Sequence, residues 1–113
     1  MSQPRIEYTR TELTEAEKQK VQADVLAYLK AGEGIFSGLR ATSAQSGTIA
    51  VCGWVRQRDY DFDYRKYPLN RPFAASYKRR GGRLGDVNSI YVANEKHEAP
   101  RLYSYCRRYG IAM

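Results

Sequence analysis

Apolar residues first recur at helical spacing. One helix face collects the positions i, i+4, i+7 and i+8, namely Val21, Val25, Tyr28 and Leu29. Thr14 and Glu17 form the T-x-x-E capping box that satisfies free backbone N–H groups where a helix begins. Gly32 stands where a left-handed residue ends a helix. The pattern predicts a helix over residues 15–31, preceded by a flexible arm over residues 1–12.

The apolar pattern then changes to the period of two that is typical of β-strands. Four segments fit it: 35–43, 48–56, 73–80 and 87–94. Gln45-Ser46-Gly47 reads as a hairpin loop between the first two, and Gly81-Gly82 lies in the turn region between the last two. Both faces of segment 48–56 are apolar, so we expect a central strand that is covered on both sides.

The last pattern is helical again. Pro100 suits the first turn of this helix and Gly110 its end. Four residues would share its inner face: Leu102, Tyr105, Cys106 and Tyr109. The order of elements predicts one α+β domain over residues 13–113, with an N-terminal helix, a small antiparallel sheet of about four strands and a short C-terminal helix.

The amino-acid composition indicates the general class of protein. The chain has 113 residues, of which 42% are apolar and 27% are charged, which is typical of one globular domain with a small core. No apolar run approaches the roughly 20 residues that span a bilayer. The polar start does not resemble a signal peptide. We therefore expect either a cytoplasmic protein or a mature exported domain whose leader has been removed.

The charge is unevenly distributed along the chain. The formal net charge is +7, yet residues 1–35 carry five Lys/Arg against six Asp/Glu, and residues 36–113 carry fourteen against six. Such an asymmetry indicates either an anionic partner or a solvated basic surface.

The two cysteines fall on predicted inner faces. Cys52 lies on the predicted central strand, and Cys106 lies on the inner face of the last helix. If this helix packs on the strand face that carries Cys52, the two thiols can meet. Two buried free thiols in a cytosolic protein are the other interpretation.

Three short motifs resemble a known group. Val51-Cys52-Gly53-Trp54-Val55 fits V-C-G-x-V, residues 67–73 fit Y-x-x-x-x-P-F, and residues 106–110 fit C-R-x-x-G. This pattern is similar to that of small exported proteobacterial proteins of unassigned function. The resemblance covers residues 14–111 and implies a periplasmic or secreted location, a Cys52–Cys106 bridge and a compact α+β fold. The chain departs from the group at residues 56–66, where the expected Asn/Gly-rich loop is absent.

Acidic and aromatic residues alternate in this divergent segment. Asp59, Asp61 and Asp63 reproduce the start of a calcium loop, but Tyr64 and Asn70 occupy the places of the required Gly and Glu. Alternating carboxylates on an extended chain also point the same way and do not encircle an ion. We expect no metal site here and no cofactor.

Two binding functions remain for the segment. Aromatic residues among nine Lys/Arg between Arg56 and Arg83 suit single-stranded nucleic acid, although three Asp lie where phosphates would pass and no known RNA-binding motif is present. Tyr and Arg are also enriched at protein-binding hot spots. The candidate binding residues are Arg58, Tyr60, Phe62, Tyr64, Arg65, Lys66, Tyr67 and Arg71.

No complete catalytic constellation is visible. His97 is the single histidine, and we expect it on the surface before the last helix. No serine or cysteine stands in a recognised nucleophile context, and phosphate-binding glycine motifs are absent. The sequence favours a small exported domain that binds a protein or an envelope component, with an inhibitor or immunity-like role as one form of this. The alternative is a basic, Tyr-rich binder of single-stranded nucleic acid in the cytosol.

Overall fold

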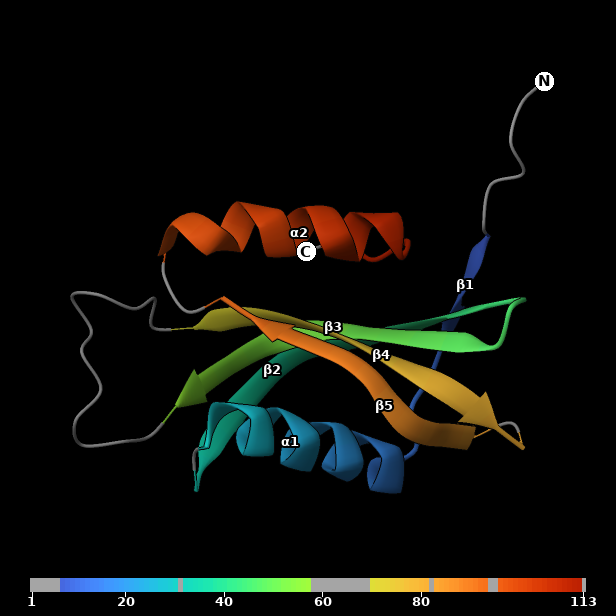
Figure 1. Ribbon diagram of the computed structural model, residues 1–113, viewed down its shortest axis with the longest axis horizontal. Helices are drawn as coiled ribbons and strands as arrows, with labels where there is room; N and C mark the ends of the chain where they lie inside the picture. The colour runs from blue at the N-terminus through green and yellow to red at the C-terminus, as the bar shows by residue number, and fades with distance from the viewer. Residues whose placement is uncertain (1–6, 31, 58–69, 82, 94–95, 113) are drawn as a thin grey trace.

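In the described part of the chain, an antiparallel sheet carries one α-helix on each face. The computed structural model describes residues 7–30, 32–57, 70–81, 83–93 and 96–112. Its elements in chain order are β1 (Tyr8–Thr11), α1 (Glu15–Leu29), β2 (Gly34–Ala44), β3 (Thr48–Gln57), β4 (Arg71–Arg80), β5 (Arg83–Val92), the short 3₁₀ helix η1 (Lys96–Glu98) and α2 (Ala99–Arg108). The five strands follow the order β1-β2-β3-β4-β5 (Figure 1). The predicted α+β class is confirmed.

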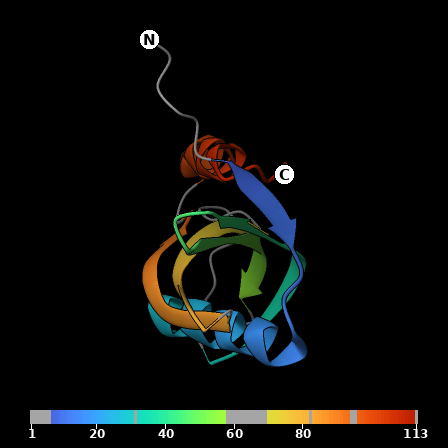
Figure 2. The same ribbon diagram turned by 90° about the vertical axis from the view of Figure 1, so that its right-hand side faces the viewer.

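The two helices cover opposite faces of the sheet. Figures 1 and 2 show α1 on the concave side of the curved sheet and α2 on the other. Val21 and Val25 of α1 are fully buried in the larger core, together with Val51 and Val55 of β3. The smaller core joins α2 to the face of the sheet that carries Cys52. The prediction that this strand is covered on both sides is therefore confirmed.

The sheet has a fifth strand that we did not predict. Residues 8–11 pair with residues 41–44 of β2, so the expectation of a flexible arm over residues 1–12 is wrong for this stretch. The first element in the described part of the chain is accordingly a strand and not a helix. Tyr-Thr-Arg-Thr has too few apolar residues to indicate a strand, and it is the free edge of β2 that provides its partner.

Helix α1 begins as predicted and ends earlier. Thr14 Oγ1 accepts a hydrogen bond from the Glu17 N–H at 3.2 Å, and Glu17 Oε1 accepts one from the Thr14 N–H at 2.9 Å, which completes the capping box. The left-handed cap is Lys30, with φ 55°, and not Gly32. Its N–H donates to Ala27 O at 3.2 Å. The chain therefore turns toward β2 two residues before the expected position.

A bulge in β2 accommodates the only tryptophan. The register with β3 shifts between Ser37 and Arg40, and Gly38 in this interval has φ +62°. A Cβ at Gly38 would lie 2.5 Å from Cζ3 of Trp54. The glycine thus provides both the backbone conformation and the space that the indole ring occupies.

Candidate functional site

A disulfide bond joins the two cysteines. Cys52 on β3 and Cys106 on α2 are bonded, with their Cα atoms 6.2 Å apart and a sequence separation of 54. Both side chains are fully buried. Around them lie Ala74, Ala93, Leu102 and Ile111. The bridge therefore holds α2 against the sheet, as the resemblance implied.

Most of the predicted binding residues cannot be placed. Seven of them, Arg58, Tyr60, Phe62, Tyr64, Arg65, Lys66 and Tyr67, lie outside the described residues. The eighth, Arg71, belongs to β4 and is only 5% exposed. Its Nε donates to Ala93 O at 2.9 Å. Arg71 thus ties β4 to the residue after β5, and we remove it from the candidate surface contacts.

A cleft at the end of β5 brings together exposed aromatic side chains. Its volume is about 350 Å³, and its lining comes from α1, β5, η1 and α2: Tyr28, Tyr91, Val92, His97, Glu98, Arg101, Leu102 and Tyr105. Tyr28 and Tyr91 are 47% and 49% exposed, respectively. We call this set the tyrosine cleft. Leu102 and Val92 are buried beneath it, so the floor of the cleft is apolar.

One wall of the tyrosine cleft is an ordered stack. The rings of Tyr91 and Tyr105 are parallel to within 2°, with centroids 5.6 Å apart. The guanidinium of Arg108 lies 5.8 Å from the centroid of the Tyr105 ring. Aromatic and cation–π contacts of this kind stabilise ring orientation. Tyr91 therefore presents a flat, positioned ring at the surface.

The chemistry of the tyrosine cleft suits binding. Its lining includes aromatic rings, the positive charge of Arg101, and the side chains of His97 and Glu98. His97 is exposed just before α2, where the sequence placed it. Over the ranges that the structure describes, no three His, Cys, Asp or Glu side chains form a group that could hold a metal ion.

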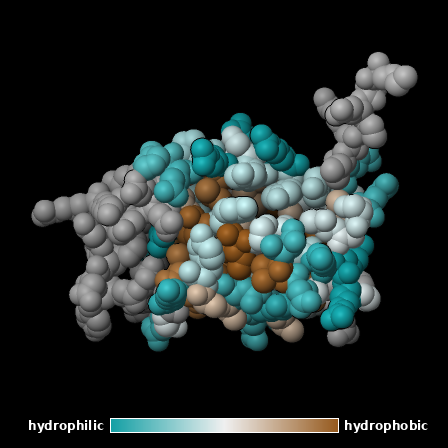
Figure 3. Space-filling model, viewed as in Figure 1, coloured by the Kyte–Doolittle hydropathy of each residue, from teal (hydrophilic) through white to brown (hydrophobic). Residues whose placement is uncertain are grey.

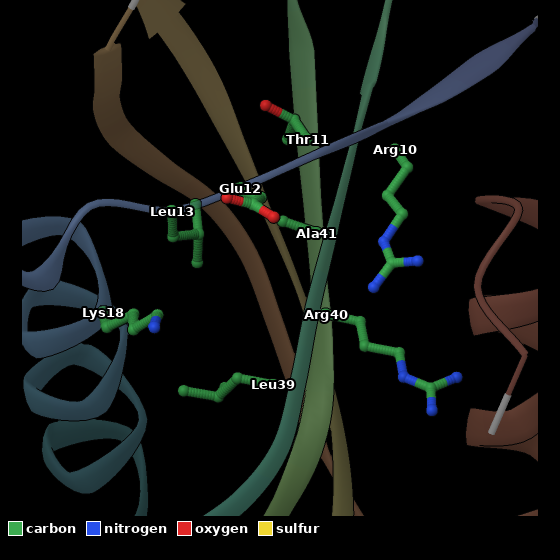
Figure 4. A pocket seen from close by; sticks show the side chains of 8 residues that line it. All are labelled: Arg10, Thr11, Glu12, Leu13, Lys18, Leu39, Arg40 and Ala41. Atoms are coloured by element: carbon green, nitrogen blue, oxygen red, sulfur yellow. The ribbon is translucent and has the colours of Figure 1, made fainter.

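A second cavity, of about 280 Å³, lies between β1, β2 and the start of α1 and is bordered by basic residues. Figure 4 shows Arg10 and Arg40 extending to the same side of β2, toward the C-terminal segment. Arg40 Nη1 donates to Ala112 O at 2.7 Å. Thr42 Oγ1 donates to Tyr109 O at 2.6 Å. Because these contacts attach the C-terminal segment to β2, and the Glu12 carboxylate adds a negative charge to the lining, we regard this cavity as the weaker candidate.

Comparison with known proteins adds no family. No protein-family model matches the chain, and neither a curated protein nor a solved structure is significantly similar to it.

Sequence reasoning found parts of the tyrosine cleft and missed its assembly. Tyr105 was placed on the inner face of its helix and is half-buried there. Tyr28 was assigned to the buried face of α1, yet it is half exposed near the end of the helix. Tyr91 was not singled out. Its signal was its place between Ile90 and Val92 in a strand, which puts the Tyr91 ring on the face opposite to those two apolar side chains.

Proposed function

We propose that the protein is a disulfide-stapled, exported binding domain, and that its tyrosine cleft binds another protein. The observation that carries this proposal is the convergence of three tyrosines from three elements on one cavity of about 350 Å³. Large aromatic side chains with few rotatable bonds supply contact area at a low entropic cost. Together with Arg, Tyr is enriched among the residues that dominate binding energy at protein interfaces.

The disulfide supports the exported location. Such bonds persist in oxidising compartments and are rare in the cytosol. A buried bridge between Cys52 and Cys106 is consistent with that environment. Among the described helices, none is long and apolar enough to cross a membrane.

A second candidate function is the binding of single-stranded nucleic acid in the cytosol. The stack of Tyr91, Tyr105 and Arg108 favours it, because bases stack on aromatic rings and guanidinium planes. The net charge of +7 also favours it. Against it, the sequence contains no known RNA-binding motif.

Photo-crosslinking in cells that naturally express the protein tests the proposal. A photoreactive amino acid replaces Tyr28 or Arg101 in the cleft, and Lys78 serves as the control because it is exposed near the opposite end of the sheet. We expect discrete protein adducts from the two cleft positions and none from the control, in the exported fraction. Adducts to nucleic acid alone, or the same adducts from all three positions, would reject the proposal.

A further inference from the structure

We propose that the partner contributes an extended, acidic segment that adds to the sheet as a strand beside β5, along Ile90–Val92. This inference rests on the proposed function and specifies how the partner binds. The last strand of the sheet, β5, has a partner on one side only among the described strands. An edge of this kind can pair with an extended peptide through its main chain.

The backbone of β5 is directed outward at two positions beside the tyrosine cleft. The Ala93 N–H donates to Pro72 O at 3.0 Å, and the register from Phe73–Val92 to Ser76–Ser89 is continuous. Hydrogen-bonded and non-hydrogen-bonded pairs alternate along an antiparallel ladder. Ile90 and Val92 consequently direct their N–H and C=O groups away from β4.

The first half of the same edge is closed to an added strand. The Leu84 N–H donates to Glu17 Oε2 on α1 at 3.0 Å. The register with β4 shifts twice, on either side of Tyr77. Bulges twist an edge and disrupt its pairing. Only the end of β5 next to the cleft keeps a regular ladder, so the position of an added strand is restricted to it.

Side chains of an added strand would meet different surfaces on its two faces. On the α2 face lies the ring of Tyr91, stacked on Tyr105. On the α1 face lie the half-buried Ile90 and the ring of Tyr28. Figure 3 shows apolar side chains gathered in the middle of this side of the molecule, over β5, with hydrophilic residues around them. Apolar or aromatic side chains of the segment would therefore be bound on both faces.

Charge complementarity specifies an acidic segment. Helix α2, which borders the cleft, contains Arg101, Arg107 and Arg108 and no acidic residue. Of these, Arg101 lines the cleft and Arg108 contacts the Tyr105 ring, so the arginines beside the cleft outnumber the one carboxylate in its lining, that of Glu98. Oppositely charged side chains steer association and set the register of a bound segment. Carboxylates beside an aromatic residue are the chemistry we expect in the partner.

The experiment uses linear peptides displayed on phage, selected on the oxidised wild-type protein. Ile90→Pro removes the outward N–H of β5 without removing a hydrogen bond to β4, and proline is tolerated on that side of an edge strand. Ile90→Ala is the matched control, because it loses the same side-chain packing and keeps the N–H. We expect acidic, aromatic peptides that bind Ile90→Pro about tenfold or more weakly than they bind Ile90→Ala. Tyr91→Ala should also weaken them.

Each outcome of these binding experiments either supports or rejects the addition of a strand to β5. Peptides that need Tyr91 but bind Ile90→Pro and Ile90→Ala equally overturn strand addition and leave the proposed function standing. Failure to enrich any peptide also overturns strand addition, while photo-crosslinking tests the proposed function separately. If Ile90→Pro does not fold, N-methylation of a selected peptide replaces it. Loss of binding at alternate methylated positions supports an added strand, and uniform tolerance rejects it.

Discussion

Gly38 is a glycine of β2 at which an added Cβ would lie only 2.5 Å from another side chain. Its positive φ and the adjacent indole of Trp54 leave no room for a side chain. Gly32, in contrast, has no atom within 4 Å of the place where its Cβ would stand. The two glycines therefore separate the effect of crowding and backbone strain from the effect of a simple Gly-to-Ala change.

We expect Gly38→Ala to lower the free energy of unfolding by about 3 kcal/mol, since a left-handed non-glycine residue and an overpacked contact each cost about 1–3 kcal/mol. Gly32→Ala should change it by less than about 0.5 kcal/mol. Urea denaturation of both variants measures the difference. Equal stabilities would show that the bulge does not depend on glycine.

Tyr77 combines full burial with a charged hydrogen-bond partner. Its hydroxyl donates to Asp24 Oδ2 at 2.9 Å, and Lys20 Nζ lies 3.1 Å from the same oxygen. The Lys20 ammonium also lies 5.5 Å from the centroid of the Tyr77 ring. Burial first, and then the hydrogen bond to Asp24 and its negative charge, raise the pKa of Tyr77 well above its ordinary range.

This shift predicts a loss of stability in alkali. The folded protein holds the phenolic proton of Tyr77 more tightly than the unfolded chain does. The contribution of this proton to the free energy of unfolding is therefore complete below the unfolded pKa near 10, and above that pH it falls by up to about 1.4 kcal/mol per pH unit. Tyr77→Phe should be less stable at neutral pH and lose less stability above pH 10. Tyr28→Phe, at a half-exposed residue, is the control for the loss of a tyrosine hydroxyl. Denaturation across pH measures both slopes, and parallel profiles for wild type and Tyr77→Phe would contradict the assignment.

Among the elements, α2 depends most on a covalent bond. Its buried residues Leu102 and Cys106 contact a core of only a few small side chains. The larger core on the other face is built around α1 and does not include α2. The disulfide therefore provides stabilisation that the small buried apolar area on this face of the sheet does not.

Reduction should destabilise the protein strongly. In the chain-entropy model, closing a loop of this length adds about 4 kcal/mol to the free energy of unfolding, which is an upper figure. Losing this contribution corresponds to a fall of many degrees in Tm for a domain of this size. The Cys52→Ala/Cys106→Ala variant should be similarly unstable and insensitive to reductant. Calorimetry with and without reductant measures the effect. Alkylation of both thiols in the unfolded, unreduced protein would show that no bridge exists.

The sequence predicted the central helices and strands better than the outer strands and the ends of elements. Periodicity and capping located α1, α2 and the central strand, because these carry dense apolar patterns. The strand β1 could not be predicted, since its four residues are mostly polar and depend on pairing with β2. The early start of β5 at Arg83 was missed for a similar reason: Gly85 and Asp86 are poor strand formers that the bulged hairpin accommodates.

The tyrosine cleft was harder to predict than the fold. Tyr28, Tyr91 and Tyr105 belong to three elements far apart in sequence. Their meeting depends on the end of α1, the edge position of β5 and the way α2 crosses the sheet. None of these is encoded in a local motif. The disulfide, in contrast, could be predicted from the sequence, because each cysteine lay on a predicted inner face and the resemblance paired the two.

For the whole molecule, charge is the property that separates the two candidate functions. A basic protein that binds single-stranded nucleic acid releases counterions, so its affinity falls steeply as salt rises. We expect no submicromolar binding to labelled single-stranded DNA or RNA at physiological salt, despite the net charge of +7. Fluorescence anisotropy over a range of salt concentrations measures this. Tight binding with a steep salt dependence would favour the cytosolic alternative.

Glu17 links two parts of the molecule that are distant in sequence. One carboxylate oxygen accepts from the Thr14 N–H at the start of α1, and the other accepts from the Leu84 N–H at the start of β5. Fraying of the first helical turn therefore also uncovers a main-chain donor on the outer strand. Opening of this helix end therefore lengthens the strand edge that is available for pairing beyond Ile90–Val92, so a stable first turn of α1 limits self-association through β5.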